Sequence, residues 1–159
     1  MDLRTCKIYL VTDEKACNGK DFYRCIEEAI KGGVGIVQLR EKNISTKDFY
    51  EKALKVKEIC KNYGALFIIN DRLDIAQAVG ADGVHLGQSD MPIEKAREIL
   101  KDRFLIGATA RNIEEAKKAE LLGADYIGSG AIFGTSTKDN AKKLEMEALK
   151  KIVSSVKIP

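Results

Sequence analysis

Short apolar runs alternate with amphipathic stretches along the whole chain. Continuous apolar runs of four to six residues are typical of parallel strands that are covered on both faces. The runs therefore predict six strands, at residues 8–12, 35–40, 66–70, 83–86, 105–109 and 126–130.

The stretches between the predicted strands have the spacing of helices with one apolar face. A helix beginning near Thr46 would carry on that face Phe49, Ala53, Val56 and Cys60. Another would begin after Asn112, an N-cap residue, with Glu115 at the third helical position. Strands that alternate with helices in this way indicate an α/β fold.

A weak internal repeat refines this prediction, because residues 33–37, 80–84 and 123–127 resemble one another. Each segment ends a helix with a glycine and enters the second, fourth or sixth strand. A repeat of two strand–helix units favours a (β/α)8 barrel, and no G-x-G-x-x-G motif follows the first strand to favour a dinucleotide-binding sheet. The alternative is that Gly-Ala-Asp is simply a common loop between a helix and a strand.

The length of 159 residues fits one domain, 1–159, with about 25 residues for each unit of a small barrel. On that scale six units are present, a seventh would begin at residues 156–159, and strands 7 and 8 are lacking. Such an arc would expose two sheet edges, so we expect a homo-oligomer in which a second chain covers them.

Composition excludes several classes of protein. The net charge of +3, without a basic block, gives no support for nucleic-acid binding. No apolar run approaches the length of a membrane span, and the first residues lack a signal-peptide pattern. Four cysteines without a C-x-x-C pair, and a single histidine, His85, argue against zinc and fit free thiols in the cytoplasm.

The candidate chemistry begins at the end of the second strand. Gln38 and Arg40 share one face of that strand, and Lys42 joins them if the chain stays extended. In these barrels the carboxyl ends of the strands form the active site, and two cations there predict a phosphate site. The alternative is a solvent-exposed Arg-Glu-Lys loop.

Two carboxylates follow neighbouring strands. Asp71 follows the third strand and Asp90 lies in the loop after the fourth. Mg²⁺ prefers one or two carboxylates together with phosphate oxygens and water, so the two could share a magnesium ion. The alternatives are that Asp71 caps the next helix, and that Asp90 is the N-cap before Met91 and Pro92.

Hydroxyl groups form a third group of candidates. Thr135, Ser136, Thr137 and Lys138 lie in the Gly-containing loop after the sixth strand, where they could wrap a phosphate. Thr109 ends the fifth strand, whereas His85 is better explained as a structural residue. Together these groups suggest displacement at a carbon that bears pyrophosphate, with Mg²⁺, arginine and lysine stabilising the leaving group.

Five motifs that occur in order resemble the thiamine-phosphate synthase (thiamine-phosphate pyrophosphorylase) family over essentially the whole chain. They are residues 9–13, 38–42, 69–72, 82–90 and 135–138. The resemblance implies Mg²⁺-dependent coupling of 4-amino-2-methyl-5-pyrimidinylmethyl diphosphate with thiazole phosphate, which yields thiamine phosphate and pyrophosphate in thiamine biosynthesis. The enzyme would be a transferase.

The resemblance also implies roles for individual residues. Gln38 would hold the pyrimidine, and Asp71 and Asp90 would bind Mg²⁺. The thiazole substrate would be held by Thr135, Ser136 and Thr137, with Thr109 at a position where the family commonly has serine. The diphosphate would be bound by Arg40, Lys42, Asn70 and Lys138, of which Arg40, Lys42 and Lys138 would act in catalysis.

Two other functions remain open at this point. A thiazole tautomerase would share the barrel without the diphosphate chemistry, and the set of cations and carboxylates argues against it. A non-catalytic remnant would bind a phosphorylated ligand without turning it over, and the lacking strands favour that alternative.

Overall fold

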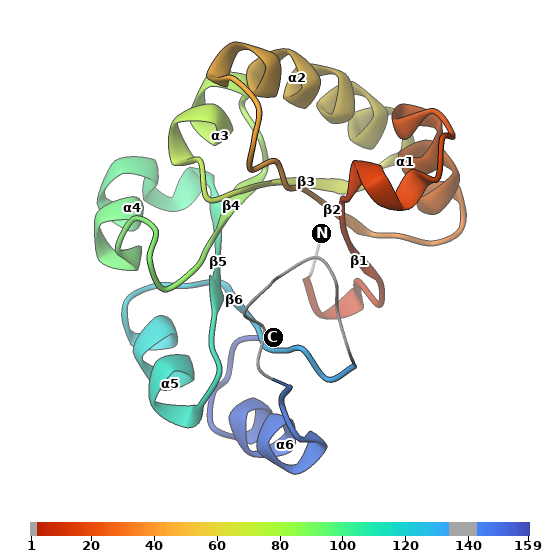
Figure 1. The fold of residues 1–159 in the computed structure, drawn as a ribbon. Helices are drawn as coiled ribbons and strands as arrows, with labels where there is room; N and C mark the ends of the chain where they lie inside the picture. Colours follow the sequence, from red (N-terminus) through yellow and green to blue (C-terminus); the bar gives the residue numbers. More distant parts are fainter. Residues whose placement is uncertain (1–2, 134–142) are drawn as a thin grey trace. The chain divides into compact units, whose positions relative to one another are not determined.

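The structure, a computed structural model, describes residues 3–133 and 143–159. It contains two compact units, Met1–His85 and Leu86–Pro159. In both units strands alternate with helices along the chain (Figure 1). In the described part of the chain, no helix combines the length and the apolar character that crossing a membrane requires.

The first unit consists of parallel strands with helices between them. Strand β1 pairs with β2, β2 with β3, and β3 with β4, all in parallel. The strands are β1 (Tyr9–Val11), β2 (Ile36–Leu39), β3 (Leu66–Asn70) and β4 (Gly83–Leu86), whose last residue begins the second unit. The helices are the short 3₁₀ turns η1 (Leu3–Thr5) and η2 (Glu14–Cys17), then α1 (Phe22–Lys31), α2 (Thr46–Tyr63) and α3 (Leu73–Val79).

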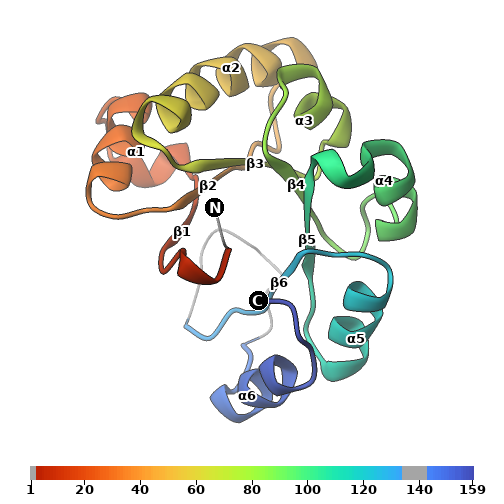
Figure 2. The ribbon, with the colours of Figure 1, turned by 180° about the vertical axis from the view of Figure 1, so that it is seen from behind.

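The second unit continues the same alternation (Figure 2). Its strands, β5 (Leu105–Thr109) and β6 (Tyr126–Gly128), pair in parallel. Its helices are α4 (Ile93–Leu100), η3 (Lys101–Arg103), α5 (Ile113–Leu121) and α6 (Met146–Ser154).

The six predicted strands are confirmed, and so is the α/β fold. The first, second and sixth strands are shorter than predicted, and the sixth ends at Gly128. Residues 156–159 form no strand, although the backbone N–H of Ile127 in β6 donates to the carbonyl oxygen of Pro159 at 2.9 Å. Closure into an eight-stranded barrel, the lack of strands 7 and 8, and a single domain all stay predictions.

The aspartate of the internal repeat makes the same hydrogen bonds at two places in the chain. In each of the later two repeats the aspartate is tied to the preceding strand by two hydrogen bonds. Asp82 accepts from the backbone N–H of Phe67 at 2.7 Å and donates its own N–H to the Phe67 carbonyl. Asp125 makes the same pair of bonds with Ile106. The repeated aspartate therefore sets the register between parallel neighbours in both units.

The helix starts follow the expected capping chemistry. Helix α2 begins at Thr46, as predicted, and Ser45 caps it, because its hydroxyl accepts from the Asp48 N–H at 3.1 Å. Asn112 caps α5 as predicted and accepts from the Glu115 N–H at 2.8 Å. The apolar face of α2 is buried at all four predicted positions.

Candidate functional site

A layer of polar side chains lies buried at the carboxyl ends of the strands of the first unit. Its members are less than a tenth exposed, although their neighbours along the strands are apolar. Thr12 follows β1, whereas the other three lie within strands: Gln38, Asn70 and His85. Buried polar groups are costly unless they are hydrogen-bonded, so such a layer marks a place where binding chemistry is expected.

Gln38 is oriented by a contact that the sequence did not predict. Its side-chain N–H donates to the hydroxyl of Tyr9 at 2.8 Å, across the pairing of β1 with β2. Among the described residues no group donates to the side-chain carbonyl of Gln38. The amide is thus held in one orientation with its acceptor oxygen available to a ligand.

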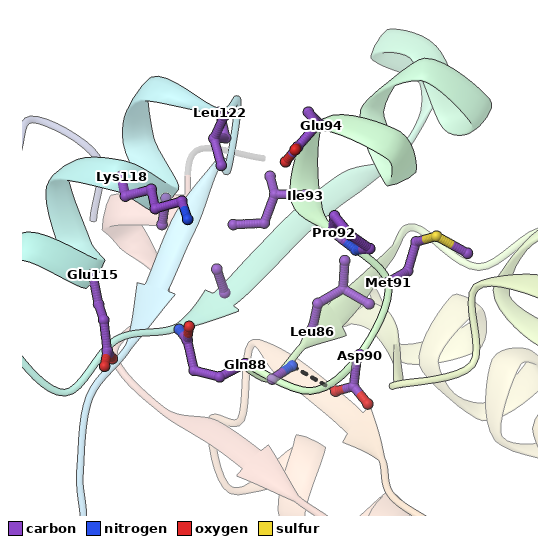
Figure 3. Close-up of a pocket in the computed structure, with 13 residues that line it drawn as sticks. Leu86, Gln88, Asp90, Met91, Pro92, Ile93, Glu94, Glu115, Lys118 and Leu122 are labelled. Carbon is purple, nitrogen blue, oxygen red and sulfur yellow. Dashed lines mark hydrogen bonds between the residues drawn. The ribbon is translucent and has the colours of Figure 1, made fainter.

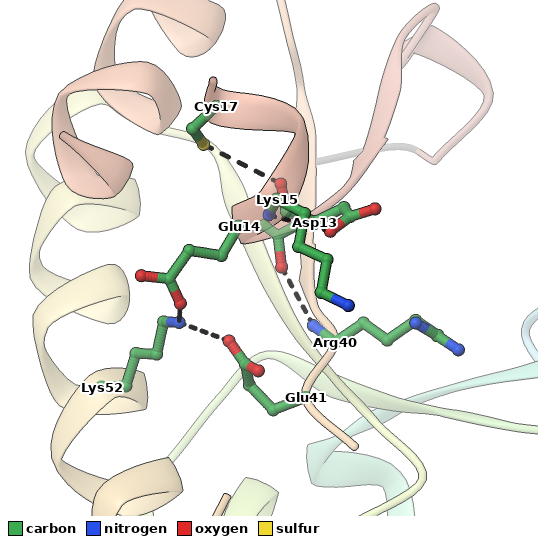
Figure 4. Close-up of polar contacts among 8 residues, drawn as sticks. Asp13, Glu14, Lys15, Cys17, Arg40, Glu41 and Lys52 are labelled. Atoms are coloured by element: carbon green, nitrogen blue, oxygen red, sulfur yellow. Dashed lines mark hydrogen bonds and ion pairs between the residues drawn. The ribbon is translucent and has the colours of Figure 1, made fainter. Parts of the chain in front are cut away.

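Arg40 was predicted to end the second strand, and it lies one residue beyond the end of β2. Its backbone N–H donates to the hydroxyl of Thr12 at 3.1 Å (Figure 4). Its side-chain Nε is buried and has no hydrogen-bond partner in the described part of the chain. A buried donor without an acceptor is rare in proteins, and an anion would supply that acceptor.

Lys42 and Asp71 lie together at the ends of β2 and β3, where they form an ion pair. Asp71 has a φ of +63°, a left-handed conformation that aspartate tolerates better than most residues. The alternative that Asp71 caps α3 is wrong, because the N-cap residue is Arg72 and no side chain caps that helix. The structure thus brings a predicted phosphate ligand and a predicted metal ligand into contact.

Asp90 belongs to a tight loop of the second unit. Its carboxylate accepts from the Gly87 N–H at 2.6 Å, and its own N–H donates to the Gly87 carbonyl at 3.2 Å (Figure 3). The alternative that Asp90 caps α4 is wrong, since Pro92 is the N-cap residue and no side chain caps the helix. The side chain of Gln88 ties the loop to the end of β5 by donating to the Thr109 carbonyl at 2.5 Å.

A cavity of about 280 Å³ opens beside this loop, between helices α4 and α5. Its lining includes Leu86 and Ala108, both buried. The charged side chains of Glu115 and Lys118 on α5 also line it (Figure 3). Side chains alternate along a strand, so the face of β5 that bears Ala108 is opposite to the face that bears Thr109. Thr109 is therefore expected to face away from the cavity.

Two further points concern the predicted site residues. Tyr9 and Thr12 both bond to predicted ligands, yet neither was proposed as a site residue. In the sequence, Tyr9 begins the apolar strand β1 and Thr12 follows it, so their local signal is a polar group at either edge of an apolar run. By contrast, the predicted loop residues Thr135, Ser136, Thr137 and Lys138 lie outside the described residues.

Comparison with known proteins decides the family. The family model described as thiamine monophosphate synthase matches residues 8–159. The chain belongs to this family. It is 90% identical to the thiamine-phosphate synthase of Fusobacterium nucleatum, with 100% of this chain and 77% of that protein covered. It is 60% identical to the thiamine-phosphate synthase of Clostridium acetobutylicum, covering 96% of this chain and 72% of that one.

A solved structure gives the same result for the fold. The thiamine phosphate pyrophosphorylase of Pyrococcus furiosus matches with a TM-score of 0.87 and 44% identity, over 97% of this chain and 72% of that one. The predicted family is confirmed, as are the α/β fold and the class of enzyme, a transferase of the thiamine-phosphate synthase type. The two alternative functions are not favoured, because the similar curated proteins are named as synthases.

Proposed function

We propose that this synthase joins 4-amino-2-methyl-5-pyrimidinylmethyl diphosphate to thiazole phosphate with the site residues described above. The bond between the pyrimidine methylene carbon and the diphosphate oxygen breaks, and a bond from that carbon to the thiazole nitrogen forms. The products are thiamine phosphate and pyrophosphate. The residues need to hold the leaving group and align the two partners, which requires no nucleophilic side chain.

The observation that carries this proposal is the buried, unpartnered Nε of Arg40. A guanidinium at the carboxyl end of a strand, beside a buried glutamine, suits a diphosphate that enters from outside the protein. Lys42 would add a second positive charge. Its ammonium group pairs with Asp71 in the free protein, and the phosphate oxygens of the substrate would compete with that carboxylate for it. Asn70, buried at the end of β3, would donate an amide hydrogen bond.

Gln38 would orient the pyrimidine. Since its N–H is held by Tyr9, its carbonyl oxygen would accept a hydrogen bond from the exocyclic amine of the ring. Thr109 and the loop residues Thr135, Ser136, Thr137 and Lys138 would bind the thiazole phosphate and the diphosphate, as the family resemblance implies. Arg40, Lys42 and Lys138 would be the catalytic cations.

The donor chemistry of Asp71 and Asp90 fits magnesium. The Asp71 carboxylate accepts from Lys42 and the Asp90 carboxylate accepts from the Gly87 N–H, each through Oδ2, and a carboxylate has about four acceptor positions. In the described ranges no three acidic, histidine or cysteine side chains are grouped so that they could hold a metal ion, but Mg²⁺ needs only one or two carboxylates beside phosphate oxygens. When bound, the ion would neutralise charge on the departing pyrophosphate.

The proposal is tested by pyrophosphate binding and by turnover with both substrates and Mg²⁺. Replacing Arg40 with methionine removes a charge-assisted hydrogen bond worth about 1.5–3 kcal/mol, so pyrophosphate affinity should fall about 10- to 100-fold in calorimetry. Arg24→Met is the matched control, because Arg24 is exposed and pairs with Glu28 on the surface of α1. An affinity for pyrophosphate that is unchanged in Arg40→Met would refute this site.

Several expectations stay predictions of the same proposal. They are the cytoplasmic location, the assembly as a homo-oligomer, and the absence of nucleic acid or membrane among the partners. Sedimentation of the purified chain tests the assembly, where a monodisperse monomer would contradict the predicted oligomer.

A further inference from the structure

Lys52, on helix α2, lies at the junction of three segments of the first unit. Its ammonium donates to Glu14 Oε2 at 2.6 Å and also to Glu41 Oε1 (Figure 4). It lies 4.0 Å from the ring centroid of Phe22, at the start of α1. Glu14 begins η2 after β1, and Glu41 belongs to the loop after β2. One side chain therefore connects the exits of two neighbouring strands to the helices outside them.

Burial distinguishes this contact from an ordinary surface ion pair. The side chains of Lys52 and Glu41 are 12% and 14% exposed, whereas that of Glu14 is 64% exposed. Burial alone would lower the pKa of Lys52, but its hydrogen bonds to Glu14 and Glu41 outweigh burial and raise the pKa. A charge this far from water depends on its partner, so removing one member leaves the other uncompensated.

Glu41 stands between the two cations of the diphosphate site. Its side chain extends to Lys52, while the guanidinium of Arg40 extends to the opposite side (Figure 4). The neighbouring Lys42 contacts Asp71 at the end of β3. Strand β2 ends at Leu39 and a bend follows at residues 42–44, so holding Glu41 fixes the short backbone segment between them, from which Arg40 and Lys42 both project.

We propose that Lys52 is a positioning residue of the diphosphate site: by holding Glu41 and Glu14, it fixes the backbone that presents Arg40 and Lys42. Lys52 itself does not touch the substrate. The inference rests on the proposed function for the identity of the bound anion. The ordering of the segment is a separate property of the free protein.

The first readout needs no ligand. The Arg40 amide donates to Thr12 between two strand exits, so its hydrogen exchange reports on that backbone. In Lys52→Met, which keeps an unbranched stem near the Phe22 ring, exchange at Arg40 should rise about tenfold. Lys52→Arg should restore slow exchange. Lys55→Met is the control, because Lys55 is exposed on the same helix and also lies over an aromatic ring, Tyr23, at 5.4 Å.

The second readout is the affinity for inorganic pyrophosphate with Mg²⁺, measured on the same proteins. We expect Lys52→Met to weaken it about tenfold and Glu41→Gln to do the same, with no further loss in the double variant. Glu14→Gln should have the smaller effect, since Glu14 is largely exposed.

The outcomes separate this inference from the proposed function. If the unchanged protein binds no pyrophosphate, the proposed function fails, while the exchange data still decide whether Lys52 orders the segment. Exchange at Arg40 that is equal in Lys52→Met and the unchanged protein overturns the inference, as does an equal rise in Lys55→Met. Faster exchange with full pyrophosphate affinity also overturns it, because the segment would then be ordered without serving the site.

Discussion

Gly107, in the middle of β5, is a position where adding a single methyl group should strongly lower the free energy of unfolding. It lies opposite Tyr126 of β6, which is buried. A Cβ added at Gly107 would come within 2.5 Å of three side-chain atoms of Tyr126. Carbon atoms normally approach to about 3.5–4.0 Å, so the ring would have to move by more than about 1 Å within a packed sheet. We therefore expect Gly107→Ala to be strongly destabilising.

The size of the effect follows from measured costs of overpacking. Inserting a methylene into a tight core costs about 1–3 kcal/mol, and the severity of this overlap places Gly107→Ala near about 3 kcal/mol. For a chain of this length that corresponds to a fall in Tm of about 6–12 °C. Urea unfolding followed by circular dichroism measures the free energy, with an unchanged m value as the check that both states are comparable.

A double-mutant cycle tests the cause. If the clash is the cause, Tyr126→Ala should cost less in the Gly107→Ala background than in the unchanged protein, because it removes the obstructing ring. A loss below about 1 kcal/mol for Gly107→Ala, or an equal cost of Tyr126→Ala in both backgrounds, would refute the reasoning.

Three further predictions concern polar side chains and a buried thiol. Asp82→Ala and Asp125→Ala each leave a strand N–H without its acceptor, so each should lower the free energy of unfolding, measured in urea, by about 1–3 kcal/mol. A free energy of unfolding equal to that of the unchanged protein would contradict the role of these aspartates in strand register. Burial, followed by the charge of Asp82, raises the pKa of the Cys60 thiol from 9.0 to about 12. The unfolded chain loses this proton first, so stability should fall as pH rises from 9 toward 12, and Cys60→Ala should show a weaker fall. Tyr9→Phe removes the acceptor that orients Gln38, so kcat/KM should drop about tenfold in the synthase assay, and an unchanged value would argue against that role.

The sequence alone determined the order of strands and helices and the positions of several key residues. Strands that are covered on both faces are largely apolar, so the apolar runs predicted the strands directly. A polar residue within such a run, such as Gln38 or Asn70, indicated the site. Capping at Asn112 was equally local, since its partner lies three residues away. The order of the motifs sufficed for the family.

Tertiary structure decided what a residue does when its partner is distant in the sequence. Asp71 and Asp90 both resembled helix caps, and only the fold showed one paired with Lys42 and the other bound to Gly87. The contacts of Tyr9 with Gln38 and of Lys52 with Glu14 join residues 29 and 38 positions apart. Local periodicity carries no information about such pairs, because parallel strands meet only after an intervening helix has returned the chain to the same edge.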